Sequence, residues 1–146
     1  MNRRVLVLSV VLLVVAGALT LHSRLAAEPR DGVFIHVSHG PEAPHRVLMA
    51  LNMATMMADS RDVLVYFDIT GVDAVLKSTE DFGFDPFPSL KAQMSTLGDK
   101  GVALVACPGC LRAAGHGPED LAEGVEVAQK EGFFAFTEGR ILTLDY

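Results

Sequence analysis

Cysteine is scarce in this sequence, and its scarcity removes two classes of small protein at once. Two cysteines in 146 residues exclude a disulfide-dense miniprotein and an array of zinc sites. Half of the residues are hydrophobic and 21% are charged, so the chain is not intrinsically disordered. We find no internal repeat and no low-complexity linker, and the length suits a single domain.

Acidic residues are missing from the first 27 positions, where a long apolar run stands instead. Residues 5–21 carry no charge, and Arg3 and Arg4 precede them. The run is longer than the usual signal-peptide core of about 7–15 residues and slightly short of the roughly 20 that span a membrane. A cleaved signal peptide and an uncleaved hydrophobic helix that anchors the chain therefore both stay open. Either one predicts a periplasmic or otherwise extracytoplasmic domain over residues 28–146, because the two arginines hold the N-terminus in the cytoplasm.

Basic residues are in deficit over the rest of the chain. Residues 28–146 contain nine Lys and Arg against 18 Asp and Glu, a net charge of −9. Phosphate backbones and anionic lipid surfaces repel a domain of this charge. We therefore expect no nucleic-acid partner.

Short β-branched runs alternate with longer helical patterns throughout residues 28–146. This alternation predicts an α/β domain, with a mainly parallel sheet and helices on both faces. The expected strands cover residues 33–37, 62–67, 102–106, 125–128 and 141–144, and the expected helices cover 44–58, 72–77, 89–97, 111–114 and 131–136.

Three loops follow the carboxyl ends of predicted strands. They are Ser38-His39-Gly40, Asp68-Ile69-Thr70 and Cys107-Pro108-Gly109-Cys110. Open parallel sheets bind ligands beyond these strand ends, so we expect the three loops to meet at one edge and to form the site.

The cysteine pair is the most informative motif of the chain. Cys107 follows a predicted strand and opens a predicted helix, where the helix dipole and unpaired N–H groups favour a thiolate. The two-residue spacing lets Cys110 reach back to Cys107, as thiol exchange or sulfur transfer requires. His39 could tune the thiolate or shuttle a proton. His36, inside a strand, is expected to be a hydrogen-bonded core histidine.

Other interpretations of the cysteines remain open. They could be a buried structural thiol pair, a static disulfide, or part of a metal site with His39 and His116. A loop with three phenylalanines, residues 81–88, is expected to cover the site edge or to bury itself against a second subunit.

Four segments resemble the DsrE/DsrF/TusD-like family, a group that includes sulfur-relay proteins and predicted peroxiredoxins. They are FIHVSHGPEAPHR (residues 34–46), ALVACPGCLRAAG (103–115), DLAEGVEVA (120–128) and the final LTL strand. The resemblance covers about residues 32–146. It implies a three-layer α/β/α fold with a five-stranded sheet, homo-oligomers, and a persulfide carried at the position of Cys107. Cys110 matches a second cysteine that only some branches carry.

These observations lead to one main hypothesis and a contrasting one. The main hypothesis is an exported or anchored protein of sulfur transfer or thiol redox, with Cys107 as nucleophile and Cys110 as resolving thiol. It implies a sulfur-donor or thiol-redox protein as partner and needs neither a cofactor nor a metal ion. The contrasting hypothesis is an oligomeric binding or assembly module with a structural disulfide.

Overall fold

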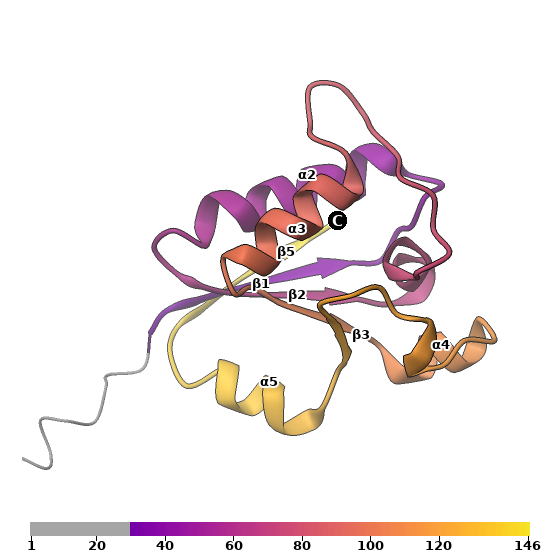
Figure 1. Cartoon of the computed structure of the whole chain (residues 1–146). Coiled ribbons are helices and arrows are strands. Elements are labelled where there is room, and N and C mark those ends of the chain that lie inside the picture. The colour runs from indigo at the N-terminus through magenta and orange to yellow at the C-terminus, as the bar shows by residue number, and fades with distance from the viewer. Residues whose placement is uncertain (1–29) are drawn as a thin grey trace, which may run out of the picture.

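Five short strands form one sheet in the computed structural model, which describes residues 30–146 (Figure 1). The sheet order is β4-β3-β2-β1-β5, and every neighbouring pair is parallel, which confirms the predicted parallel sheet. All five predicted strands are reproduced to within one residue at each end. The strands are β1 (Gly32–Val37), β2 (Asp62–Phe67), β3 (Ala103–Ala106), β4 (Val125–Val127) and β5 (Ile141–Asp145).

Helices lie on both faces of this sheet, as predicted. Helices α2 (Pro44–Met57) and α3 (Leu90–Asp99) pack side by side on one face, and α5 (Lys130–Phe136) lies on the other (Figure 1). The remaining helical segments are α4 (Pro108–Ala113) and two 3-10 turns, η1 (Ile69–Val75) and η2 (Pro118–Asp120). The predicted helix at 72–77 is thus a 3-10 turn that begins three residues earlier.

The two faces of the sheet are covered very unequally. On the α2/α3 face, side chains such as Ile35, Phe67 and Ala106 are completely buried. On the opposite face, Tyr66 and Val105 are only half-buried, because within residues 30–146 this face is covered by α5, a helix of seven residues. The core of the domain therefore lies between the sheet and the α2/α3 layer, and the α5 face is half open.

The predicted signal peptide or anchor falls on residues 1–29, outside the described residues. Export and anchoring accordingly stay predictions. Within residues 30–146, no helix is both long enough and apolar enough to cross a membrane.

Candidate functional site

The three loops predicted to meet do lie together beyond the carboxyl ends of the central strands. The backbone N–H of Asp68 donates to the Val37 carbonyl at 3.1 Å, which ties the β2 loop to the end of β1. The backbone N–H of Cys107 donates to the Phe67 carbonyl at 2.8 Å, which ties the cysteine loop to the end of β2. Parallel pairing thus brings residues distant in sequence to one edge of the sheet.

The first two loops are in direct backbone contact. The Glu42 carboxylate accepts the Thr70 hydroxyl at 2.7 Å and the Gly40 N–H at 2.9 and 3.0 Å, so it holds both loops. A Cβ atom added to Gly71 would collide with the Val37 carbonyl, and one added to Gly40 would collide with the Thr70 carbonyl. The glycines permit this approach because they have no side chain.

Cys107 is the N-cap residue of α4, and Pro108 takes the first position of the helix. Its Sγ accepts the backbone N–H of Cys110 at 3.2 Å, which is the role that an oxygen side chain usually has at an N-cap. Both cysteines are free thiols and both are half-buried. A sulfur atom at this helix start is well placed to carry negative charge.

The two sulfurs are not equivalent. Burial raises the pKa of Cys107, but hydrogen bonds from the Cys110 thiol, the Tyr66 hydroxyl and the backbone N–H groups of Cys110 and Gly109 outweigh it, so the pKa lies below its usual value. Burial and the hydrogen bond to Cys107 raise the pKa of Cys110. Of the two thiols, Cys107 is therefore the one that loses its proton more readily.

Ile69 borders the second sulfur from the loop after β2. Its φ of 48° lies in the left-handed region, which is unusual for a β-branched residue. Its backbone lowers the pKa of Cys110, against the larger effects of burial and of Cys107 that raise it. The side chain is 63% exposed, so it presents an apolar rim beside the cysteines.

His36 lies next to the site rather than in the core, which corrects the prediction in part. It is hydrogen-bonded as expected, with Nε2 2.8 Å from Asp68 Oδ1 and Nδ1 2.9 Å from Asp145 Oδ1. Its imidazole stacks on the Tyr66 ring at 6.0 Å between centroids. Burial lowers the pKa of His36, but the two carboxylates raise it by more. The histidine is on the half-open face, which is why 28% of its side chain remains exposed.

His39 hydrogen-bonds to its neighbour in the loop after β1. Its Nδ1 lies 3.2 Å from Ser38 Oγ, and the hydrogen bonds found among residues 30–146 do not join it to either sulfur. An effect of His39 on the Cys107 thiolate therefore stays a prediction. Tyr66 is the side chain that the sequence did not single out. The sequence feature that could have indicated Tyr66 is its position, one residue before the end of the central strand β2.

The arrangement of the described side chains does not support a metal site at the cysteines. No group of three or more His, Cys, Asp or Glu residues within 30–146 is arranged to hold a metal ion. His116 instead pairs with Asp120, with Nδ1 3.5 Å from Oδ2.

Two rings of the phenylalanine loop pack on their own domain. Phe82 and Phe87 are half-buried against the hydrophobic core. Phe84 is 43% exposed and stacks face to face on His45, with 4.4 Å between ring centroids. Burial of this loop against a second subunit stays a prediction.

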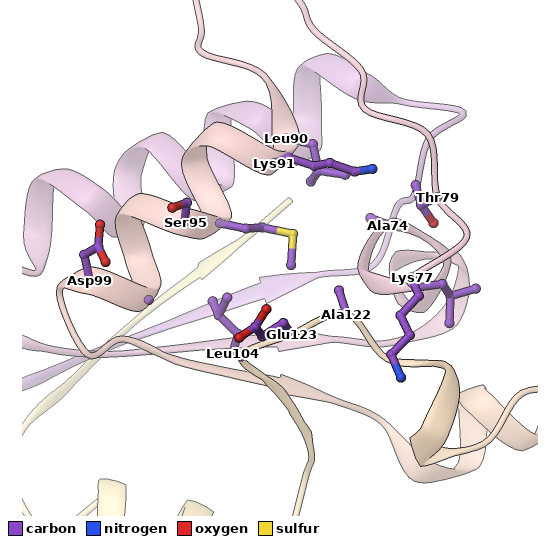
Figure 2. A pocket seen from close by; sticks show the side chains of 14 residues that line it. Ala74, Lys77, Thr79, Leu90, Lys91, Ser95, Asp99, Leu104, Ala122 and Glu123 are labelled. Atoms are coloured by element: carbon purple, nitrogen blue, oxygen red, sulfur yellow. The ribbon is translucent and has the colours of Figure 1, made fainter.

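A separate groove of about 680 Å³ runs between α3 and the loop before β4 (Figure 2). Leu90 and Leu104 contribute to its apolar lining, and no cysteine or histidine lines it. Its four charged residues, Lys77, Lys91, Asp99 and Glu123, balance in charge. The groove is thus distinct from the cysteine site.

The sequence that forms this site matches a known protein family. The profile of the DsrE/DsrF-like family matches residues 31–138, which include both cysteines and all three loops. The chain belongs to the DsrE/DsrF-like family. The resemblance noted in the sequence is thereby confirmed.

Two solved structures of similar fold extend this result. The YchN protein of E. coli superposes with a TM-score of 0.63 at 18% identity, covering 78% of this chain and 99% of that one. A protein of unknown function from Methanobacterium thermoautotrophicum gives a TM-score of 0.57 at 26% identity, covering 77% of this chain and 98% of that one. No curated protein matches the chain in sequence.

Proposed function

We propose that this DsrE/DsrF-like protein transfers sulfur or exchanges thiols through Cys107, with Cys110 as the second, resolving thiol. The unequal ionisation of the two sulfurs supports the proposal most directly. Hydrogen bonds lower the pKa of Cys107 against the effect of burial, while burial and the partner sulfur raise the pKa of Cys110. A nucleophile and a resolving thiol require this division of roles.

The chemistry can be written with its atoms and charges in balance. The Cys107 thiolate attacks the outer sulfur of a donor persulfide, R–S–SH, forming Cys107–S–SH and releasing R–S⁻. An acceptor thiolate, R′–S⁻, then takes that outer sulfur as R′–S–SH and regenerates the Cys107 thiolate. If Cys110 instead loses its proton and attacks Cys107, the products are a Cys107–Cys110 disulfide and HS⁻. A dithiol reductant then restores both thiols.

Intact mass spectrometry after incubation with glutathione persulfide tests this proposal. We expect one added sulfur atom per chain, which dithiothreitol removes. Cys107→Ser should abolish the adduct. Cys110→Ser should retain it longer than the natural chain, because the route to the disulfide is closed. An adduct of equal size in Cys107→Ser would contradict the assignment of Cys107.

The location of this chemistry is a second part of the proposal. The uncharged run at 5–21 behind Arg3 and Arg4 supports export, as a cleaved signal or as an anchor. Fusion of alkaline phosphatase after Tyr146 tests it, because that enzyme is active only where disulfides form. Activity that disappears on deletion of residues 1–27 is expected, and an inactive full-length fusion would contradict export.

Assembly into homo-oligomers is the third part, and exposed apolar side chains on both sides of the sheet support it. Phe134 on α5 is 65% exposed. Leu142 on the edge strand β5 is paired with Val33, on the α2 side of the sheet, and is 51% exposed. Exposed apolar side chains on an incompletely covered sheet are typical of contacts between subunits. Light scattering during gel filtration should give a mass above the 15.6 kDa of one chain. A pure binding module would assemble in the same way, but the double replacement of Cys107 and Cys110 would leave its activity intact.

A further inference from the structure

We propose that an apolar groove at the amino ends of β1 and β5 is a membrane-docking surface, which a phospholipid bilayer covers in the anchored chain. The cysteine site then faces away from the membrane, toward donors and acceptors in the surrounding solution. This inference rests on the anchoring part of the proposed function, because it needs the apolar run at residues 5–21 to stay attached and to lie in the bilayer.

The groove lies between the second half of α2 and the edge strand β5, and its volume is about 630 Å³. Three methionines of α2 line one side of it, and Leu142 of β5 lines the other. The methionines are Met53, Met56 and Met57, whose spacing of three and four residues places them on one face of the helix. The lining is therefore mainly apolar.

The groove is open because α2 packs chiefly on β1 and β2 and leaves the neighbouring edge strand β5 uncovered on this side (Figure 1). Leu142 is paired with Val33, which is buried under α2, so both side chains point to the α2 side of the sheet. Met56 is 63% exposed and Leu142 is 51% exposed. Large apolar side chains that stay exposed around one groove are typical of a surface that binds a partner or a membrane.

The predicted anchor joins the domain at this same groove. Asp31 and Gly32, at the start of β1, are among its lining residues. Residues 22–31 connect the apolar run to β1, and ten residues span at most about 35 Å. The groove is thus kept close to the bilayer. Docking becomes intramolecular, so even a small apolar surface is sufficient to hold the domain on the lipid.

The charged residues at the rim of the groove suit phospholipid headgroups. They are Arg61, Arg140 and Asp31, with a net charge of +1. The Arg140 side chain is 90% exposed although it pairs with Asp31. Arginine side chains at such a rim reach the phosphate groups, while neighbouring apolar side chains enter the boundary of the acyl chains.

The cysteines lie at the opposite edge of the sheet. All neighbouring strands are parallel, so the start of β1 and the end of β3 are at opposite edges (Figure 1). Strand β1 has six residues and spans about 20 Å. A bilayer at the groove therefore leaves the Cys107 loop accessible to partners in solution.

The distribution of charge favours the same orientation. At the cysteine edge, eight Asp and Glu stand against three Lys and Arg in residues 38–46, 68–89 and 107–121. At the groove edge, five stand against four in residues 30–31, 58–62, 99–102 and 137–140. An anionic bilayer repels the cysteine edge more strongly than the groove edge. In this orientation Leu142 contacts lipid, and Phe134 on α5 stays available for contacts between copies of the chain.

Fluorescent probes on single cysteines test the inference in the full chain, reconstituted into vesicles of phosphatidylcholine and phosphatidylglycerol. The natural thiols are removed by Cys107→Ser and Cys110→Ser, and an NBD probe is attached at Met56→Cys or Leu142→Cys. We expect lipids with a nitroxide on the upper acyl chain to quench either probe several-fold more than a probe at Ile69→Cys. Ile69 is the matched control, because it is 63% exposed, as Met56 is, but lies at the cysteine edge.

Three outcomes would contradict the inference, and they can be told apart. Equal quenching at positions 56, 142 and 69 in vesicle-bound chains would overturn the docking surface while anchoring stands. Probes at 56 and 142 that are shielded from aqueous iodide but not quenched by the nitroxide lipids would assign the groove to a second copy of the chain. Full-length chains that do not float with the vesicles in a density gradient would overturn the anchoring part of the proposed function, and this inference with it.

Discussion

Two glycines show how much the tolerance for a side chain varies along this chain. Gly71 lies where η1 passes the end of β1, and an added Cβ would collide with the Val37 carbonyl. Gly98 lies in the last turn of α3, and an added Cβ would meet no atom within 4 Å. The first glycine is required by a contact between two loops of the site, whereas the second only weakens a helix.

We expect Gly71→Ala to destabilise the domain by about 2 kcal/mol or more, because backbone must move to admit the methyl group. Gly98→Ala is the control and should stabilise it by up to about 1 kcal/mol through helix propensity. The free energy of unfolding in urea measures both. Equal stability of the two variants would show that the loops do not approach as closely as described.

His36 of strand β1 links this strand to β5 and to the loop after β2. His36 lies directly opposite Asp145 of β5 in the parallel register, and its other nitrogen faces Asp68 just after β2. The two carboxylates raise the pKa of His36 above 6.5 in the folded chain, although burial opposes them. The folded state therefore binds a proton more tightly than the unfolded state does.

This linkage predicts how stability changes with pH. The stabilisation from His36 is complete below about pH 6.5, its unfolded value, and is lost as the pH rises through the higher folded value. The free energy of unfolding should thus fall over this range in the natural chain, and should fall less in His36→Gln. Urea titrations at several pH values measure the difference. Asp145→Asn should show an intermediate dependence, and identical pH profiles for all three proteins would contradict the ion pairs.

At the scale of the whole molecule, stability and chemistry are divided between the two faces of the sheet. Fully buried side chains concentrate under α2 and α3. Within residues 30–146 the opposite face is covered by the short helix α5, and it carries Tyr66 and His36 near the site. Side chains that face the cysteine loop are therefore separate from those that form the core.

Two phenylalanines test where the stability resides. Phe67 is fully buried at the end of β2, and its replacement by Ala should cost about 3–5 kcal/mol, or about 1 kcal/mol for Phe67→Leu. Phe84 is partly exposed and stacked on His45, so Phe84→Ala should cost about 1 kcal/mol. Urea unfolding compares the variants. A loss from Phe84→Ala as large as that from Phe67→Ala would show that Phe84 belongs to the core.

The sequence by itself determined the elements and the place of the cysteines. Alternating β-branched runs and helical patterns are local signals, and all five strands appear where these signals predicted them. The start of a helix at Pro108 follows from proline, which suits a first helical position, and this made Cys107 an N-cap. The meeting of the three loops followed from a general property of parallel sheets.

The tertiary structure alone decided which side chains surround the sulfur. His39 follows a strand end in sequence, yet the groups that lower the pKa of Cys107 include Tyr66, on which His36 stacks. Their placement depends on the order β3-β2-β1-β5, which sets Tyr66 between β3 and β1 and Asp145 opposite His36. Strand order and register are fixed by long-range packing of the whole core. They therefore cannot be predicted from a local pattern of residues.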